Sequence, residues 1–267
     1  MSNSSKEEVK EFVRDRYAKI AEGKKESCCG TKEDSCCGPQ NTETCCSDSE
    51  SLGYSVKELK DAPEGADLGL GCGNPQAIAN LKAGEVVLDL GSGAGIDCFL
   101  AAKRVGPQGH VIGIDMTHEM LAKARENAKK GNFANTEFRL GEIEHLPVAD
   151  ESINVIISNC VINLSPDKPQ VFKEAFRVLK SGGRLAVSDV VATAVLPEDV
   201  KKDLTLYAGC MAGAAAIPEL QDILASAGFK EIRIQPKDSS REFIRDWAPG
   251  RKIEDFVVSA NITARKP

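Results

Sequence analysis

A short apolar run that leads into three alternating glycines constrains this chain more than any other feature. The run covers residues 86–90, and the glycines are Gly91, Gly93 and Gly95. Apolar residues at helical spacing follow over 96–105. Strand, glycine turn and helix in this order are the first unit of a nucleotide-binding α/β sheet. Glycine suits the turn because it is tight and because a cofactor must approach bare backbone.

The spacing of the glycines distinguishes between cofactors. A dinucleotide fingerprint, G-x-G-x-x-G, would have its third glycine where this chain has Ile96. The pattern here is D-x-G-x-G-x-G, from Asp89 to Gly95, which resembles the first motif of S-adenosylmethionine (SAM)-dependent methyltransferases. The next apolar run ends in Asp115, and an acid at the end of the second strand can accept hydrogen bonds from both ribose hydroxyls. We therefore predict a SAM site, with a purely structural strand–helix turn as the alternative.

Composition sets the broad class. The chain has 267 residues, 42% of them hydrophobic, which is enough for one large domain plus an appendage. The net charge of −6 and the lack of long basic runs argue against a nucleic-acid partner. No apolar stretch is long enough to span a membrane, and the charged N-terminus has no secretion signal. We expect a cytoplasmic protein, with a monomer as the default.

The N-terminal part, residues 1–53, is predicted to be a helix followed by a cysteine-rich arm. Apolar residues at helical spacing predict an amphipathic helix over 6–22 that docks on the main domain and ends at Gly23. The arm that follows is too polar to order itself. It carries three vicinal pairs, which can bind a soft ion or form disulfides: Cys28–Cys29, Cys36–Cys37 and Cys45–Cys46.

The main domain, residues 54–267, alternates strand and helix patterns. A capping box at Ser55 and Glu58 starts a short helix, and Asn74 is predicted to cap another that runs to about Leu81. The predicted strands are 86–90, 110–114, 136–140, 153–158, 184–189, 231–236 and an antiparallel 255–264, with helices at 95–105, 117–130 and 168–179. Residues 180–183 are predicted to be the turn before the fifth strand, and an insert at about 192–230 to cover the substrate.

Three of the remaining cysteines fall on substrate-side loops. Cys72 lies in a glycine-rich loop, Cys160 at the end of the fourth strand and Cys210 in the insert. Parallel sheets bind ligands at the carboxyl ends of their strands, so these loops can converge. Three thiolates could hold trivalent arsenic with its lone pair toward a sulfonium methyl group. A thiol pair could then return two electrons to the arsenic by forming a disulfide. The alternative is three buried cysteines, which is how we interpret Cys98.

With these motifs the chain resembles the microbial arsenite methyltransferases. The resemblance covers residues 54–267 and rests on the segments 68–75, 89–95, 113–117 and 158–165 and on Gly209-Cys210. It implies a Rossmann-like, mostly parallel seven-stranded sheet with helices on both faces. It further implies that Cys72, Cys160 and Cys210 bind As(III) or exchange disulfides, together with an N-terminal pair. Cys28–Cys29 is the first choice for that pair and Cys45–Cys46 the second.

The resemblance also implies the cofactor and partners. SAM would contact Asp89, Gly91, Gly93, Gly95, Asp115 and Met116, with Glu142 against the adenine amino group. The substrate would be arsenite or its thiol conjugates, and a thioredoxin or glutathione-type reductant would regenerate the thiols. Two alternatives stay open, namely a protein that sequesters soft metals on a methyltransferase fold and a methyltransferase for a small organic acceptor.

Overall fold

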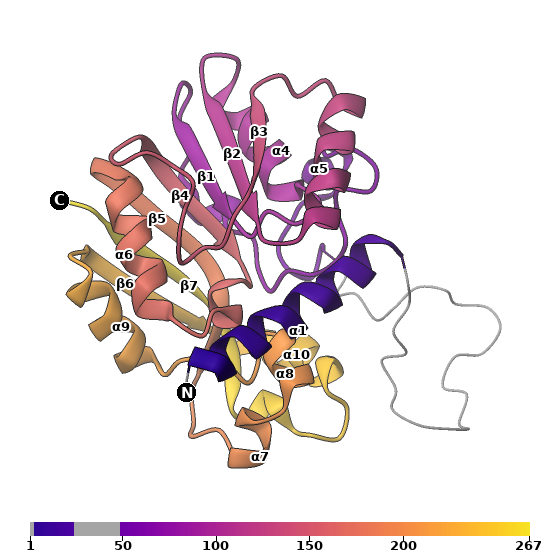
Figure 1. Ribbon diagram of the computed structural model, residues 1–267, viewed down its shortest axis with the longest axis vertical. Coiled ribbons are helices and arrows are strands. Elements are labelled where there is room, and N and C mark those ends of the chain that lie inside the picture. Colours follow the sequence, from indigo (N-terminus) through magenta and orange to yellow (C-terminus); the bar gives the residue numbers. More distant parts are fainter. Residues whose placement is uncertain (1–2, 24–48) are drawn as a thin grey trace.

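The computed structural model describes residues 3–23 and 49–267 and is organised around one seven-stranded sheet (Figure 1). The strand order is β3-β2-β1-β4-β5-β7-β6, and β7 runs antiparallel to both its neighbours whereas the other pairs are parallel. The predicted fold class is therefore confirmed. The strands are β1 Val86–Leu90, β2 His110–Asp115, β3 Thr136–Leu140, β4 Ile153–Asn159, β5 Leu179–Ala192, β6 Lys230–Lys237 and β7 Val257–Arg265.

Helices cover both faces of the sheet because the central strands are apolar on both sides. Leu88 and Leu90 of β1 pack in the core with α6 and α9, whereas Val87 packs in the core with α4 and α5. All three side chains are fully buried, and each such burial contributes about 1.5–3 kcal/mol. The helices of the two layers are α3 Gln76–Ala79, α4 Ile96–Val105, α5 His118–Lys130, α6 Lys168–Val178 and α9 Ile217–Ser226.

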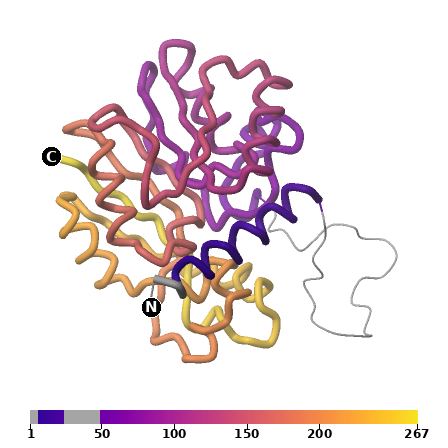
Figure 2. The backbone as a smooth tube through the Cα atoms, viewed as in Figure 1, coloured from indigo at the N-terminus to yellow at the C-terminus, as the bar shows by residue number. Residues whose placement is uncertain are grey.

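The predicted N-terminal helix is present as α1, Asn3–Ala21, and it docks on the domain as expected. Its Val9 and Val13 are buried, and Lys6 pairs with Asp167 at 2.8 Å. The helix crosses below the sheet, where it contacts α5 and the short helix α8, Leu204–Ala208 (Figures 1 and 2). It thus lies across the edge at which the parallel strands end.

Several local predictions need correction. The helix expected to reach Leu81 stops at Ala79, because Asn80 adopts a left-handed backbone with φ 52°. Its N-cap position is Pro75, although the side chain of Asn74 does accept a hydrogen bond from Gln76 N at 2.9 Å. Residues 180–183 are not a turn before the fifth strand. They form an irregularity inside β5, which already pairs Leu179 with Ile153.

The capping box at Ser55 is confirmed and starts α2, Val56–Asp61. The insert folds into α7 Glu198–Lys201, α8 and α9. Sequence patterns did not predict the short helices between β6 and β7. These are η2 Asp238–Ser240, α10 Arg241–Ile244, η3 Arg245–Trp247 and η4 Ile253–Asp255, with η1 Ile162–Leu164 after β4. The arm with its three cysteine pairs lies outside the described residues, so the boundary at residue 53 stays a prediction.

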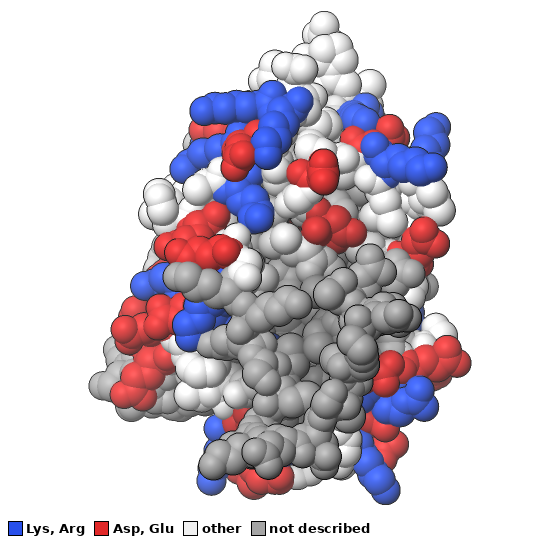
Figure 3. Space-filling model, turned by 90° about the vertical axis from the view of Figure 1, so that its right-hand side faces the viewer, with Lys and Arg blue, Asp and Glu red and all other residues white. Residues whose placement is uncertain are grey.

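The described helices do not include one that is long and apolar enough to cross a membrane. On the face shown in Figure 3, the basic and acidic side chains of the described residues are interspersed rather than segregated.

Candidate active site

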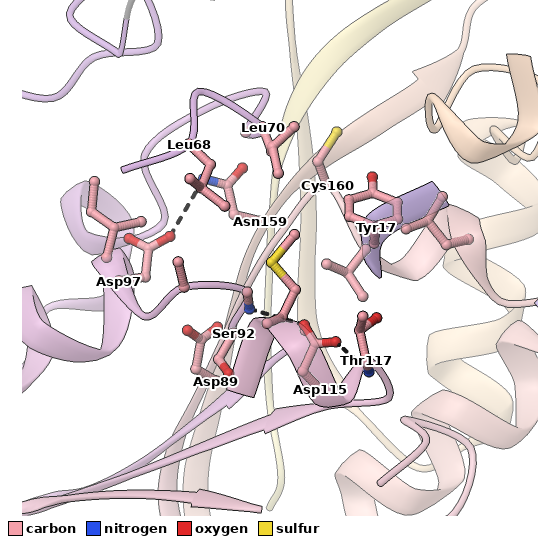
Figure 4. Close-up of a pocket in the computed structure, with 18 of the residues that line it drawn as sticks. Tyr17, Leu68, Leu70, Asp89, Ser92, Asp97, Asp115, Thr117, Asn159 and Cys160 are labelled. Atoms are coloured by element: carbon pink, nitrogen blue, oxygen red, sulfur yellow. Dashed lines mark hydrogen bonds between the residues drawn. The ribbon is translucent and has the colours of Figure 1, made fainter. Parts of the chain in front are cut away.

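A cavity lies where the parallel strands end, under helix α1. It is lined by the glycine turn after β1, the end of β2, the loop after β4 and the loop 66–71. Lys10, Val13 and Tyr17 of α1 close one side. Figure 4 shows the labelled side chains around this space, with Tyr17 and Cys160 on one side and Asp97 on the opposite side. The cavity therefore combines the predicted cofactor motif with one of the three predicted cysteines.

The glycine turn presents bare backbone to the cavity. The N–H groups of Gly91 and Ser92 both donate to Ile114 O, at 2.8 and 2.9 Å, which ties the turn to β2. Gly91 has φ +70°, and a Cβ there would lie 2.4 Å from Cγ2 of Val161. A side chain at this position is excluded by both backbone strain and space. Gly91 and Gly93 line the cavity, whereas the predicted cofactor glycine Gly95 packs against the ring of Phe99 at the start of α4.

Asp115, at the end of β2, is fixed at the cavity wall. Its carboxylate accepts hydrogen bonds from Gly93 N at 2.9 Å and Thr117 N at 2.8 Å. Burial raises the pKa of this carboxyl, although the two backbone donors oppose that shift. Met116 and Thr117 continue the wall. Asp115 is thus positioned where the sequence predicted a ribose-binding acid.

Two further acids line the cavity and are buried. Asp89 is 2% exposed and accepts a hydrogen bond from Cys98 Sγ at 3.2 Å; burial and the nearby Asp97 raise its pKa well above the usual range. Asp97 is 4% exposed, and burial raises its pKa to about 6 although Tyr54 donates to it at 2.9 Å. Among the described residues, neither acid has a lysine or arginine in hydrogen-bond contact.

These features fit SAM. Bare backbone at Gly91 and Gly93 leaves room for a ligand to approach closely, and Asp115 offers an acceptor at the end of β2. SAM carries a positively charged ammonium and a sulfonium, which would supply the positive charge that the buried Asp89 and Asp97 lack.

Glu142, the acid predicted to contact adenine, pairs with helix α1. It does not line the cavity, and its carboxylate pairs with Lys10 at 2.7 Å and with Arg14 at 3.6 Å, both on α1. Its neighbour Glu144 does reach the cavity and accepts a hydrogen bond from Ser165 at 2.6 Å. This placement gives no support to a contact between Glu142 and adenine, since the carboxylate serves to hold α1.

The three predicted cysteines meet beside the cavity. Cys72, Cys160 and Cys210 are 1%, 4% and 2% exposed. The sulfur atoms of Cys72 and Cys160 and a carboxylate oxygen of Asp189 lie within 4.8 Å of one another. Cys210 Sγ donates to the carbonyl oxygen of Cys160 at 2.6 Å. Only Cys160 of the three lines the cavity itself, so the cluster sits against one wall.

The backbone at two of these cysteines is strained. Cys160 has φ 59° and Cys210 has φ 64°, in the left-handed region that costs a non-glycine residue roughly 1–2 kcal/mol. Around Cys160 the strain is held by Asp189, which accepts from Ile162 N at 2.8 Å and from Asn163 Nδ2 at 2.9 Å. Strained residues persist where the surroundings over-determine them, and such positions gather at functional sites.

The electrostatics favour neutral thiols at Cys72 and Cys160. Burial raises the pKa of the Cys72 thiol. The neighbouring thiols of Cys210 and Cys72, followed by burial, raise the pKa of Cys160 well above its usual range. Burial, Cys210 and Cys160 also raise the pKa of Tyr17, whose hydroxyl donates to Ala208 O at 3.3 Å. Cys72 and Cys160 are therefore protonated, soft donors at neutral pH.

Sequence reasoning missed several residues that shape the site. Tyr17 belongs to a helix that was predicted only as a docking element, and Asp97 follows the glycine motif without a recognised pattern. Asn159 directly precedes Cys160, and Asp189 ends the predicted fifth strand. Asn159 and Asp189 could have been found from the sequence, because both lie at strand ends on the ligand side of the sheet.

Comparison with known proteins gives a consistent result. A family model described as "Methyltransferase domain" matches residues 81–228. The "Arsenite methyltransferase" of Halobacterium salinarum is 55% identical over 267 residues, which covers 98% of this chain and 67% of that protein. That of Aquipseudomonas alcaligenes is 43% identical over 202 residues, covering 72% of this chain and 58% of that protein. The chain thus spans about two thirds or less of the length of these relatives.

A solved structure of an arsenic methyltransferase is also similar to this chain. The arsenic(III) S-adenosylmethionine methyltransferase of Chlamydomonas reinhardtii superposes with a TM-score of 0.59 at 32% identity. The match covers 82% of this chain and 72% of that one.

Proposed function

This chain belongs to the SAM-dependent arsenite methyltransferases, and on that premise we propose that it transfers methyl groups from SAM to trivalent arsenic bound by Cys72, Cys160 and Cys210. The observation that carries the proposal is the position of the three thiols. They come from three separate loops and gather at the wall of the cavity that also holds the glycine turn and Asp115.

The thiols bind the substrate in a step that balances without added acid or base. Arsenite is As(OH)₃, and each of three cysteine thiols replaces one hydroxyl group. The thiol proton leaves with that hydroxide as water, so three As–S bonds form and three waters are released. Protonated thiols suit this exchange, and the raised pKa values of Cys72 and Cys160 keep them protonated at neutral pH.

The chain then orients the reactants. SAM, when bound, supplies an electrophilic methyl group. Cys160 lies both in the thiol cluster and in the cavity wall, so it is the link that holds the arsenic lone pair toward that methyl group. Tyr17, Val13 and Lys10 of α1 close one side of the cavity.

Formation of the As–C bond would use the arsenic lone pair, break the S–CH₃ bond of SAM with S-adenosylhomocysteine as the leaving group, and raise the formal oxidation state of arsenic by two. Two thiol sulfurs return these electrons when they join in a disulfide, and an external dithiol then reduces the disulfide to two thiols. The predicted partner pair, Cys28–Cys29 or Cys45–Cys46, lies outside the described residues, so its part in this step is an expectation.

The test is mass spectrometry of the products after the full chain is incubated with methyl-labelled SAM, arsenite and a dithiol. Labelled methylarsenicals support the proposal, and their distribution counts the transfers. Arsenite bound to the protein with SAM unconsumed would instead indicate a sequestering protein. SAM binding without arsenite binding would leave a methyltransferase of unknown acceptor, with a small organic molecule as the remaining alternative.

A further inference from the structure

The side chain of Asn159, at the end of β4, spans the backbone of Cys72. Its Oδ1 accepts a hydrogen bond from Cys72 N at 3.0 Å, and its Nδ2 donates to Gly73 O at 2.8 Å. A single planar amide thus holds the peptide group before Cys72 and the carbonyl group of the next residue, Gly73. The loop that carries Cys72 has no regular secondary structure of its own, so these two bonds fix where the thiol lies, together with the bond that Ser259 Oγ donates to Cys72 O at 2.7 Å.

The loop is shaped around this amide. A Cβ at Gly71 would lie 2.6 Å from Asn159 Nδ2 and 3.1 Å from its Oδ1, so only glycine allows the chain to pass so close. The second N–H of the amide donates to the hydroxyl of Tyr54 at 2.9 Å, and that hydroxyl donates in turn to Asp97. Both donors and one acceptor of the amide are therefore used.

Asn159 is also the residue before Cys160. It pairs in register with Ser188 of β5, and Cys160 N donates to Ser188 O at 2.8 Å. Cys72 Sγ points at the same carbonyl oxygen, at 3.5 Å. The main chain of Asn159 thus positions one thiol while its side chain positions the other, and the two sulfur atoms lie within 4.8 Å.

We propose that Asn159 is a positioning residue that holds Cys72 and Cys160 at the separation needed for one trivalent arsenic atom to bind both. The inference rests on the proposed thiolate site. Asparagine is required because the position calls for an acceptor and two donors on one planar group. Aspartate keeps the shape and the acceptor but loses both donors, and it places a second carboxylate beside Asp97, whose Oδ2 lies 3.4 Å from Nδ2.

The experiment uses the full chain with the arm cysteines replaced by serine, so that only the core thiols can respond. The replaced residues are Cys28, Cys29, Cys36, Cys37, Cys45 and Cys46. In this background Asn159→Asp is compared with Asn135→Asp. Asn135 is the matched control because its Nδ2 also donates to two backbone carbonyls, Ala102 O at 3.1 Å and Gly106 O at 3.0 Å, and it lies outside the cavity and the cysteine cluster.

Two readouts distinguish the positioning of Cys72 by Asn159 from a general destabilisation of the fold. The first is titration with phenylarsine oxide, which needs two thiols at once, and the second is the rate of iodoacetamide alkylation at each cysteine. We expect Asn159→Asp to bind the arsenical at least tenfold more weakly while alkylation of Cys72 becomes faster. Alkylation of the core residue Cys98 stays slow if the fold is intact. Asn135→Asp should match the background in both readouts.

Each outcome decides the matter. Arsenical affinity of Asn159→Asp within twofold of the background would overturn the inference but leave the thiolate site standing. A background that binds no arsenical would overturn the thiolate site and this inference with it. If Asn159→Asp does not fold, Tyr54→Phe takes its place, because it removes one partner of the amide and keeps the ring. A severalfold loss of arsenical affinity then supports the inference, and unchanged affinity refutes it.

Discussion

Replacing Gly91 by alanine tests how closely the glycine turn packs against Val161, the residue after Cys160. The new Cβ would lie 2.4 and 2.6 Å from the two methyl carbons of Val161, the residue that follows Cys160. Either the turn or the Val161 loop must move. The substitution therefore perturbs the cofactor side and the arsenic side of the cavity together.

Two effects lower the free energy of unfolding in Gly91→Ala. A non-glycine residue at φ +70° costs about 1–2 kcal/mol in backbone strain. Overpacking against Val161 adds about 1–3 kcal/mol. We expect Gly91→Ala to lower the free energy of unfolding by about 2–5 kcal/mol. Gly84 is the control, because it has φ +81° but open space around its Cβ position, so Gly84→Ala should show the strain alone, about 1–2 kcal/mol.

The assay is urea unfolding followed by circular dichroism, with SAM affinity measured by calorimetry. In a double-mutant cycle, Val161→Ala should recover the overpacking part, so the coupling energy with Gly91→Ala is expected to be about 1–3 kcal/mol. We also expect SAM affinity to fall about tenfold or more in Gly91→Ala. The reasoning is refuted if Gly91→Ala and Gly84→Ala are equally stable and the cycle shows no coupling.

Three further predictions concern the thiols, the N-terminal helix and a buried acid. Cys210→Ser should abolish methylarsenical formation in the mass-spectrometric assay but leave SAM affinity unchanged, because Cys210 does not line the cavity; retained methylation would contradict the proposed site. Lys10→Met should speed amide hydrogen exchange in α1 about twofold to fivefold, since a partly exposed ion pair is worth about 0.5–1 kcal/mol, and unchanged exchange would show that the pair does not hold the helix. Burial raises the pKa of Asp97 in the folded state to about 6. The free energy of unfolding of the wild type should therefore fall by up to about 3 kcal/mol relative to that of Asp97→Asn as the pH rises from about 4 through 6. A pH-independent difference in urea unfolding would contradict this assignment.

Local patterns in the sequence predicted most of the fold. The alternating glycines, the acid at the end of each of the first two strands and the regular spacing of apolar residues specify strand, turn and helix within short windows, and β1, α4 and β2 appear where expected. Residues 180–183 were one exception, because whether a Gly-Gly step is a turn or a strand irregularity depends on the strands beside it. Here the backbone of Lys266, directly after β7, bonds to Gly182 and Gly183, and β4 pairs with the residues on both sides of the segment.

The sequence grouped the residues of the candidate site but did not predict their contacts. Parallel strands bring their carboxyl ends to one edge, which is why Cys72, Cys160 and Cys210 could be grouped from their positions in the sequence alone. Glu142 shows the limit of such reasoning. Its position after β3 matches an adenine-binding acid, but Lys10, far away in the sequence, pairs with it at 2.7 Å. The cofactor contacts of Gly95 and Glu142 therefore remain predictions that the observed packing does not support.

The sequence by itself determined the sheet, the glycine turn and the presence of soft thiols on ligand-side loops, because these depend on backbone preferences and on the period of apolar residues. Tertiary structure decided that α1 covers the cavity and that Cys160 alone of the three thiols faces it. It also decided that Asn159 holds the Cys72 loop and that Asp189 holds the strained segment around Cys160. These are contacts between residues far apart in the chain. They are set by which surfaces pack together and which buried polar groups find partners, and no local window of sequence contains that information.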